Sequence, residues 1–256
     1  MPEIPEIEVI IDGIRDEVLG ARVKDIIVFD DRRVDELDIV KGRILRDVVR
    51  NGKAIILKFG DIWVRFHLRL TGFVRIVNTA YPVEKGWIVG FFMDNDKLLI
   101  LGDKRKLAEA RIITADDIKT APDAMNITEE EFISIVRTSK AIKSTLMDQN
   151  KILGLGNRYV DEILWRSRVH PARKGNSLTQ EELNRIFVNM KEILQEAYNL
   201  GGDEHYTDVY GNNGKWSASV HGKKVCPICG ATLQKIKIGG RTSYICPNCQ
   251  KEPRQS

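Results

Sequence analysis

Apolar residues recur at helical spacing near the N-terminus and then change to the alternation that is typical of strands. The positions that share one helical face are Ile7, Ile10, Ile11, Ile14 and Val18. Gly20 follows them, and glycine is common just beyond the C-terminus of a helix. The pattern therefore predicts an amphipathic helix over residues 3–19.

Short β-branched runs with a period of two occupy residues 21 to about 113. Asn51-Gly52 separates runs at 46–50 and 53–59, and this dipeptide is a strong signal for a hairpin. In the run 62–70, apolar residues alternate with Arg65, His67 and Arg69, which predicts one apolar face and one basic face. Further runs lie at 23–28, 73–77, 86–93 and 98–101. Several short strands without intervening helices predict a sandwich or barrel.

Helical periodicity returns after about residue 116. Thr128 with Glu131 and Thr179 with Glu182 form capping-box patterns ahead of apolar residues at helical spacing. Between these two helices, a helical stretch at 142–147 and a helix at 158–167 flank a glycine-containing turn at 154–157. Two helices joined in this way are a common nucleic-acid-docking unit. The glycine-rich, polar segment 200–222 is expected to be a mobile loop or linker.

Length and composition exclude several classes of protein. A chain of 256 residues suffices for one large or two modest domains. The most apolar stretch is the seven residues 87–93, whereas a membrane span needs about 20, so no membrane segment is expected. Glu3, Glu6 and Glu8 occupy the place where a secretory signal carries basic residues. The chain is therefore expected inside the cell, in the cytoplasm or on the nucleoid.

The positive charge is concentrated at the C-terminal end. The formal net charge is +4, but residues 215–256 hold eight Lys and Arg against one acidic residue. This segment also contains the four cysteines of the chain, Cys226, Cys229, Cys246 and Cys249, arranged as two C-x-x-C pairs. That spacing predicts one zinc ion held by four thiolates, with a structural role because no coordination position stays open for water. Zinc binding would supply folding free energy on the order of 10 kcal/mol.

The N-terminus and the turn before Arg241 can each be interpreted in two ways, as a functional site or as a purely structural feature. Initiator methionine is commonly removed before proline, and removal of Met1 would expose the secondary amine of Pro2. An amine of this kind can attack a sugar aldehyde carbon and form a Schiff base. The alternative is that Pro2 merely starts the helix and that Glu3 favours its dipole. Arg241 follows Gly239-Gly240 at a predicted turn, where it is either a phosphate or base probe or a solvated surface residue.

Motifs along nearly the whole chain, in order, resemble the formamidopyrimidine-DNA glycosylase and endonuclease VIII family. The matching segments are Pro2-Glu3-Ile4-Pro5-Glu6-Ile7-Glu8, Asp148-Gln149, Gly154-Leu155-Gly156-Asn157-Arg158-Tyr159, Asp161-Glu162, His170-Pro171, Gly240-Arg241-Thr242 and Cys246-Pro-Asn-Cys249-Gln250. The resemblance implies an α+β fold. An N-terminal helix plus an antiparallel β-sandwich would precede a helix-two-turn-helix domain with a C-terminal zinc ribbon.

The resemblance also implies roles for individual residues. Pro2 would be the nucleophile at the deoxyribose C1′ and Glu3 the acid-base carboxylate. Lys53 would contact phosphate beside the lesion, and Asn157 and Arg241 would clamp the backbone and bend the duplex.

Two loops depart from the family pattern. His67-Leu68-Arg69-Leu70-Thr71-Gly72 stands where many members read His-Leu-Gly-Met-Thr-Gly, so Leu70 replaces the methionine wedge, and His67 is kept as a DNA-binding candidate. Asp103-Lys104-Arg105-Lys106-Leu107-Ala108 stands where the oxidised-purine branch reads Asp-Pro-Arg-Arg-Phe-Gly. Arg105 is kept and Leu107 replaces the aromatic wedge. The exact lesion, the opposite-base preference and the choice between β and β,δ elimination stay open.

The function that the resemblance implies is a bifunctional DNA glycosylase and AP lyase of base excision repair, a monomer acting on damaged double-stranded DNA. The expected parts are a catalytic domain at 1–115, a helix-two-turn-helix domain at 116–200, a flexible lesion-proximal loop at 201–222 and a zinc ribbon at 223–252. The alternatives are a non-catalytic nucleic-acid-binding protein with a zinc ribbon, favoured if Met1 is retained, and a zinc-stabilised interaction module.

Overall fold

The computed structural model describes residues 1–251 and divides into two compact units. The first contains residues 1–119 together with 198–215, and the second contains 120–197 and the described residues from 216 onward. Among the described residues, no helix combines the length and the apolar character that crossing a membrane requires.

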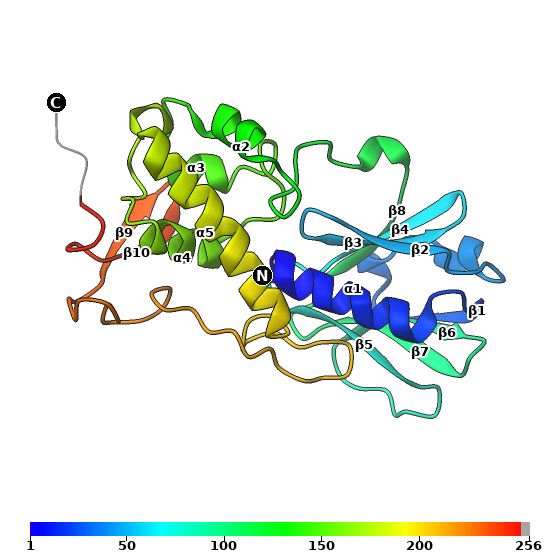
Figure 1. Cartoon of the computed structure of the whole chain (residues 1–256). Helices are drawn as coiled ribbons and strands as arrows, with labels where there is room; N and C mark the ends of the chain where they lie inside the picture. The colour runs from blue at the N-terminus through cyan, green and yellow to red at the C-terminus, as the bar shows by residue number, and fades with distance from the viewer. Residues whose placement is uncertain (252–256) are drawn as a thin grey trace. The chain divides into compact units, whose positions relative to one another are not determined.

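The first unit is a helix followed by two antiparallel four-stranded sheets (Figure 1). The helix is α1 (Ile4–Val18). One sheet has the order β1-β6-β7-β5 and the other the order β2-β3-β4-β8. The strands are β1 (Val23–Val28), β2 (Asp47–Asn51), β3 (Ala54–Phe59), β4 (Ile62–His67), β5 (Gly72–Asn78), β6 (Trp87–Met93), β7 (Lys97–Asp103) and β8 (Glu109–Ile113).

One apolar core joins α1 to both sheets. Ile7 and Ile14 of α1 are fully buried in the same cluster as Leu57 of β3 and Leu101 of β7. The helix therefore forms because its apolar face is covered by the two sheets, and this packing fixes where the N-terminus lies within the unit. The predicted helix and the hairpin at Asn51-Gly52 are both confirmed, since β2 and β3 pair up to Asn51 and Ala54.

The prediction of a single strand over 62–70 is wrong at its C-terminal end. Strand β4 stops at His67, because Arg69 takes a left-handed conformation with φ of 54°. The amide of Gly72 then donates to the carbonyl of Leu68 at 2.9 Å and closes a turn. Leu70 consequently lies on this turn with 45% of its surface exposed, and not on the apolar face of the strand. Arg69 likewise leaves the predicted basic face.

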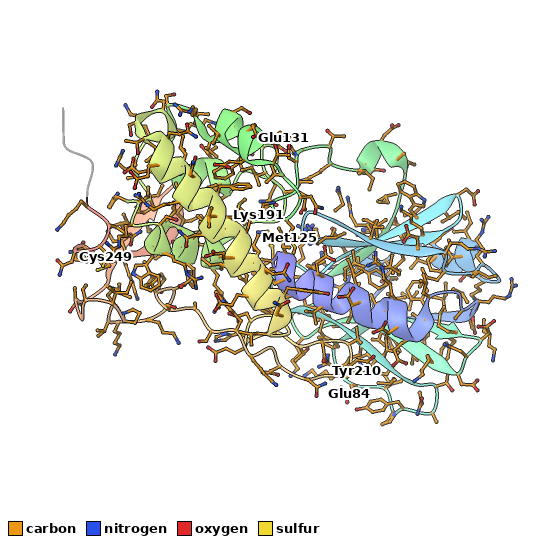
Figure 2. The ribbon with its side chains drawn as sticks, in the orientation of Figure 1. Glu84, Met125, Glu131, Lys191, Tyr210 and Cys249 are labelled. Atoms are coloured by element: carbon orange, nitrogen blue, oxygen red, sulfur yellow. The ribbon has the colours of Figure 1, made fainter. Side chains whose placement is uncertain are left out.

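The second unit contains α2 (Glu129–Val136), α3 (Ile142–Leu146), α4 (Asn157–Arg166), α5 (Gln180–Asn199) except for its last two residues, and a two-stranded hairpin of β9 (Gln234–Ile238) and β10 (Arg241–Ile245). Both predicted capping boxes form: Thr128 Oγ1 accepts from the amide of Glu131, and Thr179 Oγ1 from that of Glu182. Lys191 of α5 donates to the carbonyl of Met125 at 2.6 Å, which ties α5 to the segment before α2 (Figure 2). Single 3₁₀ turns lie at Asp31–Arg33, Leu37–Val40, Ala115–Asp117 and Gly175–Ser177.

These elements confirm the predicted α+β class with a helical second part and a C-terminal ribbon. Part of the glycine-rich segment belongs to the first unit, where Val209 is fully buried in the core. The carbonyl of Asp208 also accepts from Arg75 of β5 at 2.8 Å. The predicted domain boundaries and the mobility of 201–222 stay predictions.

Candidate nucleic-acid interface and metal centre

The N-terminus is held by several hydrogen bonds within the first unit. Pro2 and Glu3 lie directly before α1 and are buried. The terminal amine of Met1 donates to the hydroxyl of Tyr206. Glu6, in the first turn of α1, accepts the amide of Glu3 at 2.7 Å and, through its other oxygen, the amide of Asp203 at 2.9 Å. One carboxylate thus fixes the start of the chain to the segment that follows α5.

The hairpin that carries Lys53 is tied to the same helix. Nε of Arg50 donates to Oε1 of Glu8 at 2.6 Å, and Nη1 of Arg50 donates to the carbonyl of Gly52 at 3.2 Å. The Arg50 side chain is only 6% exposed, so this ion pair is shielded from solvent screening. Gly52 has φ of 62°, the conformation that the two-residue turn requires. Lys53 is therefore presented by a hairpin whose position relative to α1 is fixed.

A buried carboxylate organises the loop that carries Arg105 and Leu107. Asp103 accepts the amides of Arg105, Leu107 and Ala108 at 2.9 to 3.0 Å and the hydroxyl of Thr71. Burial by itself would raise the pKa of Asp103, but these donors outweigh burial and lower it. Because Thr71 neighbours Leu70, Asp103 connects the two loops whose sequences depart from the family pattern.

His67 lies at the end of β4 and is kept neutral at physiological pH. Burial lowers its pKa to about 4, and the positive charges of Arg69 and Arg65 act in the same direction. Its Nδ1 accepts the amide of Arg69 at 3.2 Å. A neutral ring can accept or donate a hydrogen bond to DNA but cannot neutralise a phosphate.

In the second unit, the helix-two-turn-helix and the ribbon hairpin meet at one carbonyl. Thr242 O accepts from Asn157 Nδ2 at 2.9 Å and from Lys143 Nζ at 3.3 Å. Arg241, the residue before Thr242, is exposed at the start of β10, where Gly239 and Gly240 form the preceding turn with positive φ. The sequence-predicted pair Asn157 and Arg241 is thus brought together.

A buried ion pair supports this junction. Lys143 Nζ of α3 lies 2.6 Å from Asp161 Oδ1 of α4, and both side chains are 1% exposed. The other oxygen of Asp161 lies 2.7 Å from Nδ1 of His221 and accepts the amide of Tyr244. Removing one member of a buried pair leaves an uncompensated charge, which costs roughly 3 to 5 kcal/mol. Asp161 therefore fixes α3, α4 and the ribbon hairpin together.

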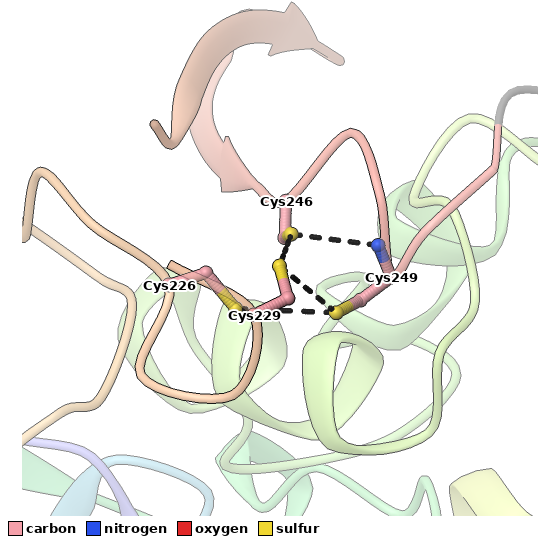
Figure 3. A group of neighbouring side chains, drawn as sticks. All are labelled: Cys226, Cys229, Cys246 and Cys249. Atoms are coloured by element: carbon pink, nitrogen blue, oxygen red, sulfur yellow. Dashed lines mark hydrogen bonds between the residues drawn. The ribbon is translucent and has the colours of Figure 1, made fainter. Parts of the chain in front are cut away.

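The four cysteine sulfurs form one cluster, all within 4.8 Å of one another (Figure 3). The separations are 3.4 Å for Cys229 and Cys246, 3.8 Å for Cys229 and Cys249, and 3.9 Å for Cys226 and Cys249. Sulfurs placed about 2.3 Å from a common tetrahedral zinc would lie roughly 3.8 Å apart, so the donor set fits this geometry. The four cysteines that the sequence predicts as metal ligands therefore lie in one cluster.

Burial and neighbouring groups shift the thiol pKa values of this cluster in opposite directions. Burial and the neighbouring sulfurs raise the pKa of Cys249 to about 12. Burial opposes ionisation of Cys226 as well, but the amide of Cys229 and the Trp165 side chain outweigh it and lower the pKa to about 6. Sulfurs this close resist joint ionisation unless a dication lies between them.

The predicted site residues fall into two groups, one in each unit. The first unit holds Pro2, Glu3, Lys53, His67, Leu70 and Arg105, and the second holds Asn157, Arg241 and the four cysteines. Sequence reasoning missed Asp203, Tyr206 and Lys143 as members of these sites. A lone lysine at a helical position and a polar glycine-rich segment carry no local signal of such long-range contacts.

Comparisons with known proteins agree with this fold. A model of the formamidopyrimidine-DNA glycosylase N-terminal domain matches residues 1–110, one of the H2TH domain of the same enzyme matches 119–208, and one of a zinc finger found in FPG and IleRS matches 223–251. Formamidopyrimidine-DNA glycosylases from Exiguobacterium sp. and Listeria innocua are each 33% identical to this chain, covering 98% of it and 100% of the relative.

Solved structures give the same result. Lactococcus lactis Fpg bound to DNA with an abasic site has a TM-score of 0.89, and MutM bound to DNA with carbocyclic 8-oxo-G has a TM-score of 0.88. Both are 31% identical to this chain and cover 98% of it and 100% of their own length. The fold, the matches and the cysteine cluster define a DNA-binding glycosylase of base excision repair with a metal-stabilised finger. The chain belongs to the formamidopyrimidine-DNA glycosylase family.

Proposed function

We propose that the protein is a bifunctional DNA glycosylase and AP lyase whose nucleophile is the amine of Pro2, exposed by removal of Met1. The observation that carries this proposal is the fixed start of α1, where Glu6 accepts the amide of Glu3, the residue next to Pro2, and the amide of Asp203. A reacting amine has to be positioned before it can attack efficiently, and these contacts, which do not involve Met1, support that positioning.

The reaction divides into base removal and strand cleavage. The lone pair of the Pro2 nitrogen attacks C1′ of a flipped nucleotide, the bond from C1′ to the base breaks, and the base leaves with a proton. Glu3 is the carboxylate that exchanges protons with the sugar during this step. The nitrogen lone pair then expels O4′, which takes a proton from Glu3, so the sugar ring opens and leaves an iminium ion that makes the C2′ hydrogen acidic. Loss of that proton expels the 3′-phosphate, and hydrolysis then returns the amine.

The substrate class is damaged duplex DNA, and the protein acts as a monomer inside the cell, in the cytoplasm or on the nucleoid. Related structures hold an abasic site and an 8-oxo-guanine analogue, which supports a flipped, oxidised or ring-opened base as the target. Leu70, exposed on its turn, is the apolar wedge, and Arg105 and His67 contact the DNA beside it.

Backbone contacts come from both units. Lys53, Asn157 and Arg241 bind phosphates, which positions the duplex without reading its sequence. The ribbon carries Arg241 and is held by one zinc ion on Cys226, Cys229, Cys246 and Cys249. The sulfur separations near 3.8 Å support zinc, and the ion is structural because the four thiolates fill its coordination sphere.

Borohydride trapping tests the catalytic proposal. We expect the protein to form a covalent complex with DNA that contains an abasic site, because the reductant converts the imine to a stable amine. A variant with one extra residue retained before Pro2 should lose trapping while it still binds the DNA. Absence of trapping by the processed protein, combined with tight binding, would favour the non-catalytic nucleic-acid-binding alternative.

A further inference from the structure

The ribbon cysteines pack on a tryptophan that comes from outside the ribbon. Trp165, near the C-terminal end of α4, forms a small buried cluster with Val220, Cys226, Leu233 and Cys246. Trp165 is 6% exposed, and Cys226 and Cys246 are 1% and 0% exposed. The largest side chain of this cluster is therefore supplied by the helix-two-turn-helix part of the chain, and the cluster contains two of the four cysteines.

The indole nitrogen of Trp165 is buried and lacks a well-formed hydrogen bond. Among the described residues, Nε1 of Trp165 has no partner of good hydrogen-bond geometry. A buried N–H without an acceptor is destabilising, and buried tryptophans usually find an acceptor. The buried N–H of Trp165 lies beside the metal site, so we expect its hydrogen bond to form with a cysteine sulfur that carries negative charge.

Within this cluster, the cysteine sulfurs are the side-chain atoms that can accept a hydrogen bond from Trp165. Val220, Leu233 and the neighbouring Ala231 carry only hydrocarbon side chains, whereas the cysteine sulfurs can accept. A thiol sulfur is a weak acceptor, but a metal-bound thiolate carries negative charge, and hydrogen bonds to charged groups are roughly twice as strong as neutral ones.

We propose that Trp165 is a positioning residue of the metal site, whose indole N–H donates to the Cys226 thiolate and strengthens its hold on the ion. The inference rests on the proposed zinc site and goes beyond the four ligands. Groups that hydrogen-bond to metal ligands typically change metal affinity 10- to 100-fold when they are removed. Trp165 also joins α4 to the ribbon, so metal binding and the junction of Asn157 with Thr242 share one helix.

Trp165→Phe in the full-length zinc-loaded protein tests the proposal, because phenylalanine keeps an aromatic ring and removes the N–H. We expect about a 10-fold loss of zinc affinity, measured by competition with a chromophoric chelator at fixed pH. With Co²⁺ in place of zinc, the thiolate-to-cobalt charge-transfer band should shift to lower energy. The readouts are metal affinity and a spectrum, so they do not depend on repair activity.

The first unit offers a matched control. Trp87 is 4% exposed, its Nε1 is likewise buried without a partner among the described residues, and its cluster contains no sulfur. Trp87→Phe should therefore leave zinc affinity and the cobalt spectrum unchanged. Should Trp165→Phe fold poorly, 3-benzothienylalanine at position 165 removes the N–H at nearly constant shape, and it should weaken zinc binding by a similar factor.

The possible outcomes distinguish the role of Trp165 from the existence of the zinc site. Unchanged zinc affinity and an unchanged cobalt spectrum in both Trp165 variants would overturn the proposed role of Trp165 while leaving the zinc site intact. Failure of the unmodified protein to bind zinc would instead contradict the zinc site itself.

Discussion

At the scale of single residues, the surroundings of a side chain decide its charge. His67 is the clearest case, because burial and two nearby arginines keep its ring neutral. The unfolded chain takes up a proton at this histidine near pH 6.5, whereas the folded protein does so only near pH 4. The free energy of unfolding therefore decreases as the pH falls through this window, by at most about 3 kcal/mol from this group.

His67→Asn removes that titration. We expect the variant to lose less stability than the unmodified protein between pH 7 and pH 4.5, as measured by urea unfolding at both values. The two proteins should differ little in the slope of unfolding free energy against urea concentration, because their folds are the same. Identical losses of stability in the two proteins would show that His67 titrates normally in the folded state.

At the scale of elements, turns and hairpins present the proposed phosphate contacts. The β9–β10 turn exposes Arg241, and the β2–β3 hairpin carries Lys53. We expect Arg241→Ala to weaken binding to all duplexes alike and to reduce the slope of log affinity against log salt by about 0.9. Lys53→Ala should act similarly, whereas Leu70→Ala should keep the salt slope and slow base removal. An altered lesion preference with an unchanged salt slope for Arg241→Ala would mean that Arg241 reads a base.

Local signals explain which elements could be predicted from the sequence. The capping boxes at Thr128 and Thr179 and the Asn51-Gly52 turn depend on residues a few positions apart, and all three form. The end of β4 was missed because alternation continues to Leu70, while the backbone turns at Arg69. A turn that interrupts an unbroken alternating pattern has no signature in residue type alone.

Contacts between distant residues could not be predicted in this way. Glu6 and Asp203 are 197 positions apart, and their hydrogen bond depends on how the segment after α5 returns to α1. The partnership of Lys143 with Asp161 likewise depends on how α3 packs against α4. The cysteines were an exception, because their paired spacing encodes a metal site independently of the surrounding fold.

At the scale of the whole molecule, the first unit and the ribbon obtain their stability from different sources. The first has a large apolar core that joins α1 to both sheets, while the ribbon depends on four thiolates and a small cluster around Trp165. We expect removal of zinc by a chelator to abolish DNA binding while the β-sandwich stays folded. Circular dichroism and a DNA-binding titration on the same sample check this. Normal binding and nicking by zinc-free protein would show that the ribbon does not clamp the DNA.

The Pro2 amine is expected to form the covalent bond to the sugar, and locating that bond on the protein is the decisive test. The borohydride-trapped complex with abasic-site DNA is digested with protease and nuclease, and the residue that carries the sugar remnant is identified by tandem mass spectrometry. We expect the remnant on the N-terminal nitrogen of Pro2, in a peptide that lacks Met1. A remnant on Lys53 or on any other lysine would show that Pro2 is not the nucleophile.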